Sequence, residues 1–143
     1  MKKVLLILAL CGGMGACTGG EAKRSADSRQ AKSEVVEVLY FHGVQRCATC
    51  MAIEKNAGEL IETAYAEPLK SGELVFRSVD IAEEEVLAGK YEVSWSSLIL
   101  VDYDESGNER ATNLTEFAFG CARTDPDKFK SGLSQRIDEM LNN

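Results

Sequence analysis

The feature that most constrains the fold is a Cys-x-x-Cys motif placed where a strand pattern changes into a helix pattern. Residues Glu34–Phe41, EVVEVLYF, are rich in β-branched and aromatic side chains, which favour a β-strand. A loop at His42–Arg46 then leads to the motif, which runs from Cys47 to Cys50. After it, apolar residues recur at the spacing of one buried helix face: Ile53, Ala57, Leu60, Ile61, Ala64 and Tyr65. Both cysteines are therefore expected at the N-terminus of a helix that follows a strand.

The rest of the chain continues this alternation of strand and helix patterns. The predicted elements are a strand at Glu73–Asp80, a short helix at Glu83–Tyr91, strands at Ser97–Tyr103 and Arg110–Leu114, and a final helix from Pro126 with Asp125 as its N-cap. With right-handed crossovers, we expect the first three strands to be parallel and the fourth to lie antiparallel at an edge. The predicted fold class is α/β, with a central mixed sheet of about four strands flanked by helices.

The first 33 residues have the composition of an export signal followed by a linker. Lys2 and Lys3 precede a short apolar run that cannot span a hydrocarbon core of about 30 Å. Small residues directly precede Cys17, as at a bacterial lipoprotein cleavage site. We therefore expect residues 1–16 to be a lipoprotein signal peptide, Cys17 to carry the lipid, and residues 17–33 to begin with that cysteine and continue as a flexible tether. The alternative is ordinary signal cleavage that leaves Cys17 as a free thiol.

The charge of the chain restricts its partners. Residues 34–143 suit a single domain, which we expect to be monomeric. The formal net charge is −7, and removing Lys2 and Lys3 with the signal peptide lowers it by two, to −9. Such an acidic chain without a basic cluster argues against nucleic acid as a partner. The expected location is the periplasmic side of a bacterial membrane, with the lipid as the contact to the membrane.

Two thiols at the start of a helix are suited to disulfide exchange. The helix N-terminus presents unpaired N–H groups and a partial positive charge, and Arg46 adds a cation, so both would lower the thiol pKa of Cys47. Cys50 lies on the same side of the first turn, where it can resolve a mixed disulfide formed by Cys47. Thr49 could donate to a sulfur or cap the helix. His42 could tune Cys47 or relay a proton, although a polar loop residue bonded to backbone is the simpler interpretation.

Two other interpretations of the cysteines remain open at this point. A Cys47–Cys50 staple would close a very short loop and so stabilise the fold little, which favours a redox-active disulfide that needs no other cofactor. A metal site could instead combine Cys47, Cys50, Cys121 and His42, and the three thiols alone could hold trivalent arsenic. The surrounding FAFG favours Cys121 as a buried thiol, and the alternative is a third redox thiol.

The order of elements, with a dithiol opening the first helix, resembles the thioredoxin fold over nearly all of residues 34–143. The segments YFHG, RCATC and AIEKN, with a later LT…FAF…AR…P…F, resemble a bacterial thioredoxin-like family more closely. Members of that family are labelled subunits of a nitrophenyl-compound nitroreductase and are associated with arsenic-resistance gene clusters. The resemblance implies thiol–disulfide exchange, with a protein dithiol or disulfide as the redox partner. The alternative is a non-catalytic subunit of a redox complex that uses the fold as a docking surface.

The sequence departs from the thioredoxin pattern beside the expected dithiol. Thioredoxin-like proteins usually have a cis-proline just before the third core strand, where this chain has Trp95, Ser96 and Ser97. We expect trans peptide bonds there, because a cis bond before serine costs about 3 kcal/mol. These three residues are the candidates for a substrate groove, although simple packing is the preferred interpretation of Trp95. The first strand also lacks the buried acid of thioredoxins, since its last part reads Leu39, Tyr40 and Phe41.

Overall fold

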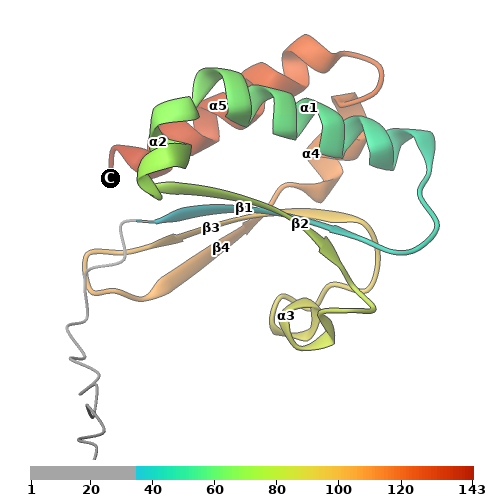
Figure 1. Ribbon diagram of the computed structural model, residues 1–143, viewed down its shortest axis with the longest axis horizontal. Helices are drawn as coiled ribbons and strands as arrows, with labels where there is room; N and C mark the ends of the chain where they lie inside the picture. Colours follow the sequence, from blue (N-terminus) through green and yellow to red (C-terminus); the bar gives the residue numbers. More distant parts are fainter. Residues whose placement is uncertain (1–34) are drawn as a thin grey trace, which may run out of the picture.

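The structure, a computed structural model, describes residues 35–143, so the expectations for the signal peptide, Cys17 and the tether lie outside the described residues. Nine elements follow one another along the chain (Figure 1). They are β1 Val36–His42, α1 Ala48–Ala64, α2 Ala66–Ser71, β2 Leu74–Asp80, α3 Glu85–Lys90, β3 Ser97–Tyr103, β4 Glu109–Asn113, α4 Thr115–Cys121 and α5 Pro126–Leu141. Among these described residues, no helix is both long and apolar enough to cross a membrane.

The four strands form one mixed sheet in the order β2-β1-β3-β4. The predicted sheet of four strands with an antiparallel edge strand is confirmed, but the predicted direction of the third strand was wrong. β1 pairs in parallel with β2, whereas β3 runs antiparallel to β1 and begins opposite Phe41. The reason is the length of α3. Its six residues rise about 9 Å, whereas a seven-residue strand spans about 23 Å, so this connection does not return the chain to the far end of the sheet.

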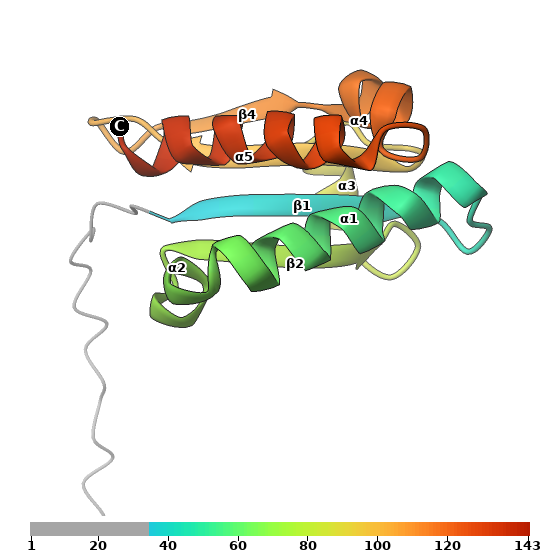
Figure 2. The ribbon, with the colours of Figure 1, turned by 90° about the horizontal axis from the view of Figure 1, so that it is seen from above.

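Helices cover the two faces of the sheet unequally. Figure 1 shows α1, α4 and α5 on one face and the short α3 on the other, and Figure 2 shows α1 and α5 side by side along the sheet. The larger core cluster lies under α1, α4 and α5 and includes Tyr40, Ile53, Leu100 and Phe129, all fully buried. The smaller cluster lies under α3 and contains Leu39, Phe41 and Val101. Alternate residues of β1 therefore contribute to different cores, as the two-residue period of a strand requires.

The two long helices begin where their local sequence predicts. α1 starts immediately after Cys47, and its Ile53, Ala57 and Ile61 are fully buried, although Ala64 of the predicted face is exposed. At α5 the Asp125 side chain accepts the Lys128 N–H at 3.0 Å, and Pro126 occupies the first turn. The short helices α2 and α4 were not predicted. Each has at most seven residues, so neither shows the repeated period that identifies a helix in sequence.

We predict that Gly132→Ala lowers the free energy of unfolding by about 1–2 kcal/mol, because an added methyl group overpacks the contact between α4 and α5. A Cβ at this position would lie 2.5 Å from Cζ of Phe117, whose ring is stacked on Phe129. The matched control is Gly120→Ala in α4, where an added Cβ meets nothing within 4 Å. The control should keep or raise stability through helix propensity, and urea denaturation of both variants measures the difference. Equal stability of the two variants would refute the close packing.

Candidate functional site

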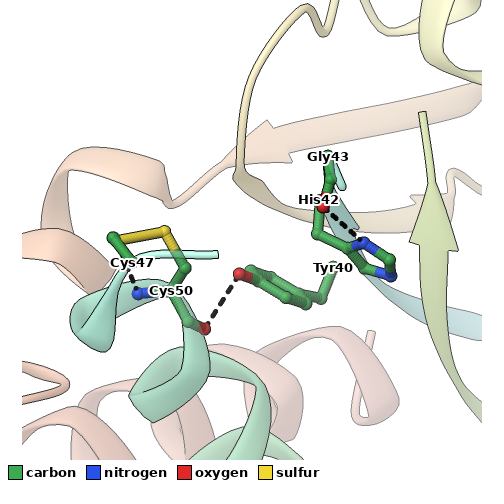
Figure 3. The surroundings of a disulfide bond; sticks show 5 residues. All are labelled: Tyr40, His42, Gly43, Cys47 and Cys50. Carbon is green, nitrogen blue, oxygen red and sulfur yellow. Dashed lines mark hydrogen bonds between the residues drawn. A yellow bond between two sulfur atoms is a disulfide. The ribbon is translucent and has the colours of Figure 1, made fainter. Parts of the chain in front are cut away.

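The two cysteines lie at the junction of β1 and α1. Cys47 is the N-cap of α1, and its Sγ accepts the backbone N–H of Cys50 at 3.0 Å. The Cα atoms of the two cysteines are 5.0 Å apart, and their sulfurs are joined in a disulfide (Figure 3). The expected helix start at the motif is therefore confirmed, and one sulfur satisfies an N–H group that the helix terminus leaves unpaired.

The two cysteines differ in their access to solvent. Cys47 is exposed, whereas Cys50 is only 6% exposed. An incoming thiolate can therefore reach the Cys47 side of the bond, and Cys50 is shielded from direct attack. In the reduced state the same N–H contact would stabilise a thiolate on Cys47, because hydrogen bonds to a charged acceptor are stronger than those to a neutral one. The geometry thus distinguishes an accessible cysteine from a shielded one.

A buried tyrosine lies directly against the dithiol. Tyr40 is fully buried, and its hydroxyl donates to the Cys50 carbonyl at 2.8 Å, as Figure 3 shows. Burial raises the pKa of Tyr40, and the side chain of Ser96 offsets part of this rise. The hydroxyl is thus protonated at neutral pH and acts as a hydrogen-bond donor. Sequence reasoning assigned no role to this residue. Its signal was a polar hydroxyl in an otherwise apolar part of β1, two residues after Val38 and hence on the same buried face.

Three residues were expected to activate or orient the dithiol, and the structure gives each of them a different set of contacts. Arg46 precedes Cys47 but forms an ion pair with Glu54 of α1. The helix cap comes from the Cys47 sulfur, so Thr49 does not provide it. His42 is the last residue of β1 and not part of the loop, and its Nδ1 lies 3.2 Å from the Gly43 carbonyl oxygen. In Figure 3 its imidazole lies on the side of Tyr40 away from the disulfide, which agrees with the simpler interpretation.

The candidate groove residues lie at the same end of the sheet as the dithiol. Ser97 begins β3 opposite Phe41, and its hydroxyl donates to the Trp95 carbonyl at 2.9 Å. No cis peptide bond occurs anywhere in residues 35–143, so the expected trans geometry at the serines is confirmed. Trp95 is 58% exposed, and its ring centroid lies 5.3 Å from that of Phe119 at an interplanar angle of 45°. The indole therefore packs against one aromatic side chain of α4 and remains largely in solvent.

Cys121 is a buried thiol, as its surroundings predicted. It is 5% exposed, and its Sγ donates to the Phe117 carbonyl at 3.0 Å. Burial raises the pKa of this thiol, which keeps it protonated and unreactive at neutral pH. Within the described part of the chain, no three His, Cys, Asp or Glu side chains are grouped so that they could hold a metal ion. The alternative set of Cys47, Cys50, Cys121 and His42 is therefore not brought together.

We predict that Tyr40→Phe lowers the free energy of unfolding of the oxidised protein by about 1 kcal/mol. The variant keeps the buried ring but removes the hydrogen bond to the Cys50 carbonyl. Urea denaturation monitored by far-UV circular dichroism measures the change. An unchanged midpoint would show that the hydroxyl contributes no net stability to this end of the sheet.

Comparison with solved structures identifies the fold, although the sequence matches no protein-family model and no curated protein. The Trx4 domain of ERdj5 superposes with a TM-score of 0.51 at 14% sequence identity, over 77% of this chain and 82% of that one. Trxlp from Edwardsiella tarda EIB202 has a TM-score of 0.44 at 18% identity, covering 76% and 93% of the two chains. A thioredoxin from Thermus thermophilus has a TM-score of 0.44 at 17% identity, covering 72% and 74%. With the element order and sheet described above, the first of these superpositions shows that the domain has a thioredoxin-like fold.

Proposed function

We propose that this protein is a thiol–disulfide oxidoreductase that uses the Cys47–Cys50 pair. The observation that carries the proposal is the asymmetry of the pair, in which one cysteine is exposed and caps α1 with its sulfur while the other is buried. The short loop adds to this support, since a disulfide between residues three apart stabilises a fold little. A reversible redox role therefore accounts for this bond better than a structural role does.

The proposed reaction conserves atoms and electrons. The Cys47 thiolate attacks one sulfur of a partner disulfide and forms a mixed disulfide, while the other partner sulfur leaves as a thiolate that takes up a proton. Cys50 then loses its proton and attacks the Cys47 sulfur. The second partner sulfur leaves as a thiol, and the Cys47–Cys50 disulfide forms. Two electrons and two protons pass from the protein to its partner, and the reverse sequence oxidises a partner dithiol.

The surroundings of Cys47 favour a protein as the partner. Three of the most exposed large apolar side chains belong to the segments that flank the dithiol, namely Val44 at 85%, Met51 at 52% and Trp95 at 58% exposure. Such a surface suits contact with apolar side chains around a partner cystine. Membership of the nitroreductase-subunit family would agree with this role, because a dithiol subunit would exchange electrons with another protein chain of the same system.

The N-terminal sequence supports a membrane anchor for this domain. We include in the proposal a lipid on Cys17 and a location on the periplasmic side of a bacterial membrane. Several acyl chains bind a membrane durably, since each buried CH₂ contributes about 0.8 kcal/mol. An anchored domain would meet its redox partners close to the membrane surface and outside the reducing cytosol.

Cys50→Ala should trap a mixed disulfide through Cys47, because the resolving thiol is absent. Non-reducing electrophoresis and intact mass after incubation with a disulfide substrate, such as a scrambled secretory protein, detect the adduct. Cys47→Ala should form no such adduct, and Cys121→Ala should exchange as fast as the unaltered protein. Stoichiometric retention of zinc or arsenite by the reduced protein, with no adduct in any variant, would contradict the proposal.

In the reduced protein at pH 7, iodoacetamide should modify Cys47 first and Cys121 about tenfold or more slowly, because thiolate content and access control the rate. Cys121 is buried with a raised pKa, whereas Cys47 is exposed at a helix N-terminus. Peptide mass spectrometry at timed intervals gives both rates. Denaturation in guanidinium should abolish the difference, and equal rates in the folded protein would refute the assigned order.

Cys17→Ser should release the protein from the membrane fraction of a bacterial host, because the lipid attachment point is lost. The matched control is Cys11→Ser, which alters the other N-terminal cysteine and should leave fractionation unchanged. Mass spectrometry of the N-terminal peptide identifies the lipid on Cys17. Membrane association of Cys17→Ser equal to that of the control would exclude the proposed anchor.

A further inference from the structure

The cation next to the attacking cysteine is held by a specific acid. Arg46 precedes Cys47, and its guanidinium makes a two-point contact with Glu54, in which Nη1 pairs with Oε2 and Nη2 lies 3.5 Å from Oε1. Both side chains are partly buried, at 30% and 26% exposure. The carboxylate of Glu54 is also anchored from the sheet, because the Ser78 hydroxyl of β2 donates to its Oε1 at 2.5 Å. The position of Arg46 is therefore set by α1 and β2 together.

The charges of this pair act in opposite directions on Tyr40, which lies next to the dithiol. Burial is the main cause of the raised pKa of Tyr40, and among the smaller effects Arg46 lowers that pKa while Glu54 raises it. The Tyr40 hydroxyl donates to the Cys50 carbonyl, so the group on which both charges act lies beside the disulfide. Other ionisable groups in the surrounding elements include His42 of β1, which bonds the Gly43 carbonyl, Asp80 of β2, which lies opposite His42 in the register, and Arg123, which follows the residue whose carbonyl accepts from an asparagine of α1. The segment before β3 contributes Trp95 and Ser96, which are uncharged.

We propose that Glu54 is a positioning residue that holds Arg46 and offsets its charge, and so limits the stabilisation of a Cys47 thiolate. This inference rests on the proposed function, because it concerns how reactive the attacking thiol is. The helix N-terminus and the Cys50 N–H still stabilise the thiolate, and the neutralised Arg46 adds little. Reduced protein is then less favoured than it would be with a free arginine, so the dithiol is a weaker oxidant and a better reductant.

The test is the pH midpoint of Cys47 ionisation in the reduced protein, followed by thiolate absorbance near 240 nm and by the pH profile of alkylation. Glu54→Gln should lower the midpoint, raising the thiolate fraction below it about two- to fivefold, which is the order of effect of removing one nearby charge in a largely aqueous surrounding. Ser78→Ala, which removes only the anchor of the carboxylate, should act in the same direction and less strongly. The matched control is Glu59→Gln, since Glu59 is also an ion-paired acid of α1 but bonds Lys55 and Lys130 farther along the helix.

Replacing Arg46 should shift the midpoint of Cys47 ionisation in the opposite direction. Arg46→Gln should raise the midpoint, because Glu54 is left without its partner near the thiol, and the double variant with Glu54→Gln should return close to the unaltered protein. At a pH above the midpoint, the ratio of reduced to oxidised protein at equilibrium with dithiothreitol should be higher for Glu54→Gln than for the unaltered protein. The factor should equal the increase in thiolate fraction measured below the midpoint. A merely structural contact would change stability without moving the midpoint or this equilibrium.

The outcomes separate this inference from the proposed function. A Glu54→Gln midpoint that equals that of Glu59→Gln, or that lies above the unaltered value, overturns the inference. An Arg46→Gln midpoint equal to the unaltered value also overturns it. The proposed function is judged independently, by mixed-disulfide formation in Cys50→Ala. Failure of that adduct with an intact midpoint shift would reject the function and leave the charge effect in place.

Discussion

The hydrogen bond from the Cys50 N–H to the Cys47 sulfur connects the chemistry of this domain to its fold. A helix N-terminus leaves several N–H groups without partners, and a side-chain oxygen usually caps one of them. In α1 the cap is a sulfur at 3.0 Å. A thiolate accepts hydrogen bonds more strongly than a disulfide sulfur does, so reduction strengthens the cap while oxidation closes the bond. The start of the helix is thus maintained in both redox states.

Most of the stability of the domain is expected from its packed cores and little from that disulfide. Two core clusters, one on each face of the sheet, contain the fully buried side chains of β1, β3, α1 and α5. A disulfide that closes so short a loop adds little to this packing. The bond can therefore open and close at the rim of a sheet that stays folded, which is what repeated exchange requires. Tyr40 connects the core to the dithiol, because its ring lies in the larger core cluster and its hydroxyl donates to the Cys50 carbonyl.

Features set by near neighbours in sequence were predicted correctly. The strand before the motif, the helix start at Cys47 and the cap at Asp125 each depend on a few adjacent residues. The short helices α2 and α4 were missed because they are too brief to display a period. The extent to which Trp95 is enclosed depends on the elements around it, and the structure leaves its ring 58% exposed beside Phe119.

The sequence by itself determined where the elements lie, which cysteines sit together at a helix N-terminus and that an exchange reaction is the chemistry to expect. These follow from propensity, periodicity and capping, which act over a single turn or strand. The tertiary structure decided the antiparallel direction of β3, the contact of Tyr40 with Cys50 and the triad of Arg46, Glu54 and Ser78. Those depend on residues that are from eight positions apart, as for Arg46 and Glu54, to 56 positions apart, as for Phe41 and Ser97, and only the tertiary fold brings such residues within bonding distance.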